Sequence, residues 1–90
     1  MITKYDADRN GHSFGTLDLR TIVDADHRAL AERIRRAVRR AKIGPIVTLR
    51  IEDDGRFAVW TRHPRRHFDL HSAGSIRDGV LRLNGKIEEE

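Results

Sequence analysis

Residues 26–42 read DHRALAERIRRAVRRAK, and this stretch decides the fold. At about 100° per residue, its apolar side chains gather on one side of a helix and its basic side chains on the other. The apolar side consists of Leu30, Ile34, Ala37, Val38 and Ala41. The basic side consists of Arg28, Arg35, Arg36, Arg39, Arg40 and Lys42, with Arg33 at the border and Glu32 as the one interruption. The pattern predicts an amphipathic helix with one face in a core and one cationic face.

Both ends of this helix carry recognisable signals. Asp24 or Asp26 can cap the first turn, where the positive end of the helix dipole favours a carboxylate. At the other end Lys42 is followed by Gly44, which we expect to form a left-handed cap, and then by Pro45. The helix is therefore bounded closely on both sides.

A β-hairpin is predicted after the helix, because apolar and polar residues alternate on both sides of an acidic glycine turn at 53–55. A two-residue turn would mix the two faces, whereas a three-residue turn with Gly55 at a bulge sets Ile51 against Phe57 and Leu49 against Val59. We therefore predict the three-residue loop. The core face is then Val47, Leu49, Ile51, Phe57 and Val59, and the opposite face is Thr48, Arg50, Glu52, Ala58, Trp60 and Arg62.

Weaker patterns predict the remaining elements. Leu17 and Leu19 alternate with polar residues and suggest a first strand over 14–22, preceded by an arm or loop over 1–13. Residues 67–71 suggest an edge strand with Phe68 and Leu70 inward, and a short helix starting at Pro64 competes with it. Two short strands at 80–83 and 86–88 flank the hairpin dipeptide at 84–85, and 88–90 form an acidic tail.

These elements predict a single α+β domain over 1–90, in which one amphipathic helix packs on a small, mostly antiparallel sheet. The order along the chain is β-α-β-β-β with a short C-terminal hairpin. We expect Leu30, Ile34 and Val38 to pack against the core face of the first hairpin. The first and second strands can be parallel neighbours through a right-handed crossover, and exposed edges at 67–71 and at the C-terminus would allow a homodimer.

The composition is strongly basic. Net charge is +4, the sequence pI is about 10.3, and arginine outnumbers lysine fifteen to three. A high arginine share favours bidentate recognition of anions, although a GC-rich genome gives the same bias. Cysteine is absent and no apolar run could span a membrane, so we expect no thiolate metal site, no cofactor, no membrane partner and a cytoplasmic location.

The cationic helix face favours a nucleic-acid partner, since guanidinium groups match phosphate geometry and repel one another without an anion. We predict a small accessory protein without catalysis, in which DNA or RNA phosphates contact the helix. Trp60 beside Arg50 and Arg62 would add a stacking plate if the strand is single. The predicted helix contacts are Arg28, Arg35, Arg36, Arg39 and Arg40.

A protein partner is the alternative. The same helix, or the face around Trp60, could dock an acidic protein surface, as phage-encoded adaptors and inhibitors do. Trp60 could also be an ordinary structural residue with Arg50 laid over its ring. The nucleic-acid and adaptor hypotheses predict different responses to salt, because phosphate binding weakens steeply as salt is added.

A small ribonuclease is the third hypothesis. His63, His67 and His71 recur every four residues beside Arg65 and Arg66, and such histidines could serve as acid and base or hold a divalent metal. The stretch 46–68, a hairpin with an acidic turn followed by a basic histidine segment, resembles the end of RelE-type ribonuclease toxins over about a quarter of the chain. Those toxins have a helical pair before the sheet, and Phe68 stands where they carry a tyrosine.

A calcium loop is suggested by Asp6, Asp8, Asn10 and Gly11, which place oxygen donors at alternate positions before a glycine. The loop is incomplete, because Leu17 occupies the position of the bidentate glutamate. A polar turn explains the same residues, and we predict no metal here.

Overall fold

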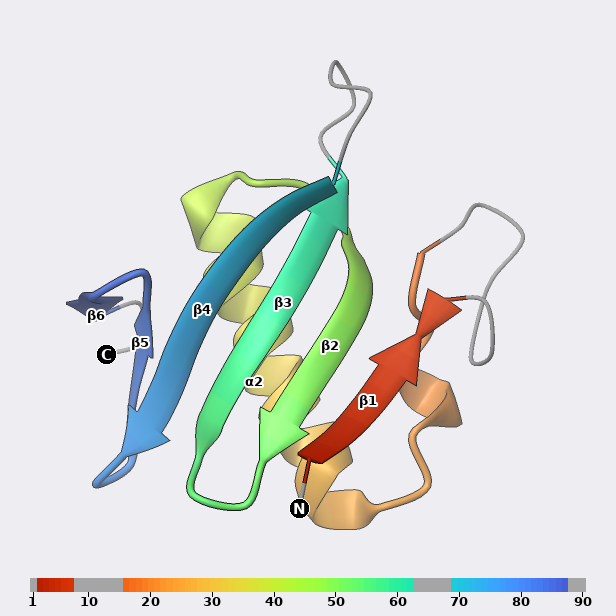
Figure 1. The fold of residues 1–90 in the computed structure, drawn as a ribbon, viewed down its shortest axis with the longest axis horizontal. Helices are drawn as coiled ribbons and strands as arrows, with labels where there is room; N and C mark the ends of the chain where they lie inside the picture. Colours follow the sequence, from red (N-terminus) through yellow and green to blue (C-terminus); the bar gives the residue numbers. More distant parts are fainter. Residues whose placement is uncertain (1, 8–15, 63–68, 88–90) are drawn as a thin grey trace.

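The computed structural model describes residues 2–7, 16–62 and 69–87. They form one antiparallel sheet with helix α2 packed across one face, which confirms the predicted α+β class (Figure 1). The strands follow one another in chain order, so each strand pairs with the next. The elements are β1 (Ile2–Asp6), the 3-10 turn η1 (Leu19–Thr21), α2 (Ala25–Ala41), β2 (Ile46–Glu52), β3 (Arg56–Arg62), β4 (Asp69–Arg77), β5 (Val80–Leu83) and β6 (Lys86–Ile87).

Helix α2 has the predicted extent to within one residue at each end. The Asp24 carboxylate accepts a hydrogen bond from the His27 N–H at 3.0 Å, which confirms Asp24 as one of the two expected caps. The left-handed cap is Lys42, with φ of 57°, and not Gly44 as predicted; Gly44 follows with φ of 100°. The chain therefore turns out of the helix over three residues before Pro45 begins the approach to β2.

The hairpin of β2 and β3 has the predicted register. Ile51 pairs with Phe57 and Leu49 with Val59, and Gly55 has the positive φ that a three-residue loop requires. A bulge between Ile46 and Thr48 changes one predicted core residue. Ile46 enters the core cluster in place of Val47, because the extra residue rotates the start of β2 by one position.

The first strand lies in a different place from the predicted one. Residues 16–22 do not form a strand: Leu17 makes a single backbone hydrogen bond to Ile46, and Leu19 belongs to the 3-10 turn. Strand β1 comes from the segment that was predicted to be an arm, and it pairs with β2 antiparallel, so the parallel crossover is also wrong. The Tyr5 hydroxyl, 2.7 Å from Nδ1 of His27, ties β1 to the start of α2.

The predicted edge strand is wrong in its position and its length. β4 runs from Asp69 to Arg77 and lies inside the sheet between β3 and β5, so the edges are β1 and β6. The C-terminal hairpin is confirmed, since Asn84 and Gly85 both have positive φ as its two-residue turn requires. The competing helix at Pro64 and the acidic tail over 88–90 lie outside the described residues.

The core lies between α2 and one face of the sheet. Ile34 and Val38 from the helix meet the inward residues of the central strands, and Leu30 is partly buried beside them. Leu81 and Leu83 of β5 are almost fully buried and were not predicted. The inward residues of the sheet are Leu49, Ile51, Phe57, Val59, Leu81 and Leu83. Since strand residues alternate, every second side chain points to the opposite face, where the figure shows no helix (Figure 1).

Candidate nucleic-acid interface

The outer side of α2 carries a row of exposed arginines. The helix buries Ala31, Ile34, Ala37 and Val38 against the sheet, so the arginines between them face solvent. From Arg28 to Arg39 they extend about 17 Å along the helix axis at ~1.5 Å per residue. Arg28, Arg36, Arg39 and Arg40 are exposed, and Arg35 is partly exposed.

Few of these charges are neutralised by carboxylates of the protein. Arg35 donates from Nε and Nη2 to Oε2 of Glu32, at 3.1 and 3.0 Å. Arg33 is used structurally, since it donates to the carbonyl of Gly79 at 2.7 Å and so ties α2 to the β4–β5 turn. Across 2–7, 16–62 and 69–87, Arg28, Arg36 and Arg39 have no salt bridge and no side-chain hydrogen bond. Their charge is therefore available to an external anion.

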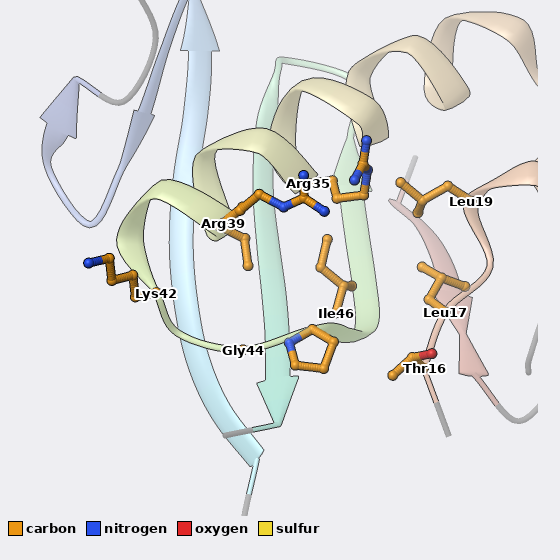
Figure 2. Close-up of a pocket in the computed structure, with 10 residues that line it drawn as sticks. Thr16, Leu17, Leu19, Arg35, Arg39, Lys42, Gly44 and Ile46 are labelled. Atoms are coloured by element: carbon orange, nitrogen blue, oxygen red, sulfur yellow. The ribbon is translucent and has the colours of Figure 1, made fainter. Parts of the chain in front are cut away.

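A cleft of about 580 Å³ lies beside the C-terminal half of this helix (Figure 2). Its walls are apolar where Leu17, Leu19 and Ile46 approach α2 and cationic along the helix. Figure 2 shows Arg35 and Arg39 on the helix side and Thr16, Leu17 and Leu19 on the other side. The lining residues are Thr16, Leu17, Leu19, Arg35, Val38, Arg39, Lys42, Gly44, Pro45 and Ile46. The cleft thus offers apolar contact next to three cations.

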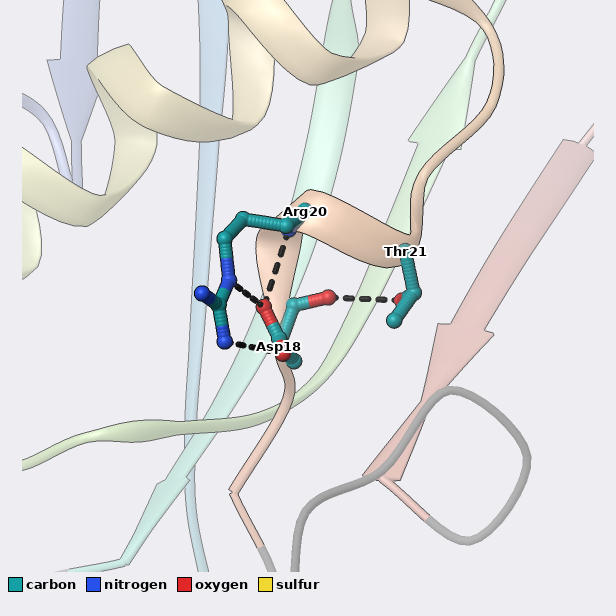
Figure 3. Close-up of polar contacts among 3 residues, drawn as sticks. All are labelled: Asp18, Arg20 and Thr21. Atoms are coloured by element: carbon teal, nitrogen blue, oxygen red, sulfur yellow. Dashed lines mark hydrogen bonds and ion pairs between the residues drawn. The ribbon is translucent and has the colours of Figure 1, made fainter.

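The far wall of the cleft is held in shape by Asp18 (Figure 3). Its carboxylate accepts from the backbone N–H of Arg20 at 3.0 Å and from the Arg20 guanidinium at 2.9 and 3.0 Å. The hydroxyl of Thr21 donates to the Asp18 carbonyl at 2.6 Å. The bond to Asp18 raises the pKa of Arg20, and Arg20 is already neutralised, so it adds little to the cationic surface.

The face of the sheet away from the helix has an aromatic centre. Trp60 of β3 lies opposite Thr48 on one side and His71 on the other. The rings of Trp60 and His71 have centroids 4.9 Å apart and are tilted by 52°. The Arg50 guanidinium lies 5.7 Å from the Trp60 ring, which is a cation–π distance and confirms the expected contact.

The predicted site residues therefore fall into two groups on opposite sides of the molecule. The helix arginines lie on one side, and Arg50, Trp60 and Arg62 lie on the other, because their strand neighbours Leu49 and Val59 face the helix. Arg62 is paired with Asp69 at 3.2 Å and is less available than predicted. One ligand surface cannot include both groups without wrapping around an edge of the sheet.

Three further cations belong to these surfaces and were not part of the predicted site. Lys42 lines the helix cleft, while His71 and Lys4 lie on the open sheet face. Lys4 was missed because its strand was taken for an arm. His71 had been noted only as a metal ligand, although its alternation with Leu70 already placed it on the outward face.

The predicted metal and histidine sites are not supported by the described residues. His63 and His67 lie outside them, as do Asp8, Asn10 and Gly11 of the calcium loop. Within 2–7, 16–62 and 69–87 no three His, Cys, Asp or Glu side chains group to hold a metal ion. In the same ranges no helix combines the length and the apolar character that crossing a membrane requires.

Searches of protein-family models, curated proteins and solved structures returned no match to this chain. Function has to be inferred from side chains and their geometry.

Proposed function

We propose that this protein binds nucleic acid without catalysis, through phosphate contacts to the outer face of α2. The observation that carries the proposal is the row of exposed arginines that lack carboxylate partners in the described part of the chain, represented by Arg28, Arg36 and Arg39. Guanidinium groups close together on one helix repel one another, and a polyanion relieves that repulsion at several points at once. A cytoplasmic location fits such a partner.

Phosphate binding has a distinctive dependence on salt. Each phosphate neutralised by the protein releases a condensed counterion, so log Kobs falls linearly with log salt, by about 0.9 per contact for duplex DNA and about 0.7 for single strands. Fluorescence anisotropy with labelled random-sequence oligonucleotides across a salt series measures both the affinity and this slope. Absence of binding in dilute buffer, or binding that salt does not change, would overturn the proposal.

The decisive variant is Arg36→Ala with Arg39→Ala. Neither residue takes part in the core, so the fold should be retained, and we expect weaker binding and a salt slope reduced by about 2 for duplex DNA. The matched control is Arg20→Ala with Arg56→Ala, which removes the same charge. Both control residues are already bound to carboxylates, Arg20 to Asp18 and Arg56 to Asp54. An equal loss in both double variants would mean that only net charge matters, and the helix surface would be rejected.

An adaptor that docks an acidic protein surface is the second candidate. The cleft beside α2 favours it, because apolar walls next to Arg35, Arg39 and Lys42 suit an acidic segment that also carries apolar side chains. Such an interface would keep its affinity at salt concentrations that dissociate a phosphate complex. The salt series therefore separates the two candidates. A homodimer and a ribonuclease activity stay predictions.

A further inference from the structure

The open face of the sheet carries a row of three cross-strand neighbours that differs in character from the rest of the surface. Thr48, Trp60 and His71 lie side by side on β2, β3 and β4, with the indole in the middle. Trp60 is partly exposed although it is the chain's one tryptophan. A residue with that much apolar area usually packs in a core, and here the core is on the other side of the sheet.

The adjacent row gives this centre a low floor and a cationic border. Lys4, Arg50, Ala58 and Ala73 follow one another across β1, β2, β3 and β4. The two alanines stand next to Trp60 and His71 along their strands, so the aromatic pair rises above small side chains. Lys4 and Arg50 lie together at the β1–β2 end of the row, and like charges placed directly opposite one another are unfavourable without an anion.

The acidic side chains of this face are largely engaged elsewhere. Glu52 lies 3.6 Å from Arg56, and Asp69 lies 3.2 Å from Arg62. Neither carboxylate is paired with Lys4 or Arg50. The charge next to Trp60 is therefore positive, and the aromatic pair has a cationic neighbour on the side where a phosphate chain would run.

We infer that this open sheet face binds single-stranded nucleic acid, with a base stacked on Trp60 and His71 and the backbone held by Arg50 and Lys4. The inference rests on the proposed function and names its substrate class. A base can stack on a protein ring only when it is unpaired, so a duplex would offer this face its phosphates but no base plane. The surface on α2 reads phosphates alone and is separate from this one.

Trp60 itself reports the contact, because it is the one tryptophan in the chain. Stacking of a base should quench its fluorescence during titration with a single-stranded oligonucleotide of roughly 12 nucleotides, within the ~4–16 nucleotides that single-strand folds cover. The matched duplex should leave the emission nearly unchanged. We expect affinity for the single strand to fall about 10-fold in Trp60→Leu, to recover largely in Trp60→Phe, and to fall less in His71→Ala.

The outcomes separate this inference from the proposed function. No binding of either oligonucleotide would overturn both. Equal binding of both, with unchanged Trp60 emission and an unaffected Trp60→Leu variant, would overturn the inference alone. Arg36→Ala with Arg39→Ala should weaken the two oligonucleotides in parallel and keep the quenching by the single strand. Loss of that quenching in the helix variant would show that the two surfaces are one site. If Trp60→Leu fails to fold, the fluorescence titration of the unaltered protein still decides.

Discussion

The two faces of the sheet are built from the same strands and have opposite chemistry. On the covered face Leu49, Val59 and Leu81 are completely buried under α2. On the open face, their strand neighbours Arg50, Trp60 and Arg82 are charged or aromatic and reach solvent. The covered face is therefore constrained by packing, and the open face is constrained by whatever the protein binds.

This difference makes the open face informative. A side chain on the covered face is explained by the core it fills, so its identity says little about function. Nothing in the packing requires an indole and two cations side by side on the open face. The predictions below test how strictly the two faces are separated, and each pairs a change on the covered side with a matched change on the open side.

The largest effect should come from emptying the covered face. Leu81→Ala removes a fully buried side chain of β5 where this strand meets α2, and we expect a loss of about 2–5 kcal/mol in the free energy of unfolding. The neighbouring change Arg82→Ala on the open face should alter it by less than about 0.5 kcal/mol. Urea unfolding followed by circular dichroism measures both. Similar losses in the two variants would mean that the faces are not separated as described.

The next effect should come from overfilling the covered face at Gly74. A Cβ at this position would lie 2.5 Å from Cζ of Phe57 and would also meet the carbonyl oxygen of Arg82. Because the second obstacle is backbone, relief requires the strands to move, and Gly74→Ala should cost about 1–3 kcal/mol. Ala73→Val, one residue earlier and on the open face, should change the stability by less than about 0.5 kcal/mol. A Gly74→Ala variant as stable as the parent would show that Phe57 can leave the glycine.

Sequence patterns predicted the parts of this fold whose determinants are local. The helix followed from its apolar period and the Asp24 cap, and the register of β2 and β3 followed from the Gly55 turn. β1 and the length of β4 could not be predicted, since they depend on pairing with distant strands. The arrangement Leu17–Asp18–Leu19 imitates a strand by alternation, although Asp18 folds it into a 3-10 turn.

The candidate site shows the same division. Exposure of the helix arginines could be predicted from periodicity, because the opposite side of α2 was plainly apolar. Grouping them with Arg50 and Trp60 could not be tested from sequence, since that requires knowing which sheet face the helix covers. Lys4 joined the open face only through the long-range pairing of β1 with β2.

A smaller effect, of opposite sign, is expected at Thr61. Its side chain is completely buried on the covered face, and its hydroxyl has no hydrogen-bond partner in the described part of the structure. Since an unsatisfied buried hydroxyl is unfavourable, Thr61→Val should raise the free energy of unfolding by about 1 kcal/mol. Thr48→Val on the open face should have almost no effect. A destabilised Thr61→Val variant would mean that the hydroxyl is hydrogen-bonded in solution. Thermal unfolding monitored by circular dichroism is sufficient to detect the shift.

The smallest effect should be a dependence on acid that acts on both layers of the molecule. Asp24 at the start of α2 and Asp54 in the β2–β3 turn each accept a backbone N–H, from His27 and Arg56 respectively, and these bonds lower both pKa values below their usual 3.8. A carboxyl group with a lowered folded pKa contributes stability that is fully present above its unfolded pKa and is lost as pH falls through the folded value. The melting temperature should therefore decline below about pH 4. Asn accepts the same bond without titrating, so Asp24→Asn and Asp54→Asn should each flatten part of that decline. If the decline from Asp24 is absent while that from Asp54 persists, the helix cap contributes less to stability than the hairpin turn, and the helix layer is the more loosely fixed of the two. Parallel pH profiles in all three proteins would show that neither carboxylate contributes.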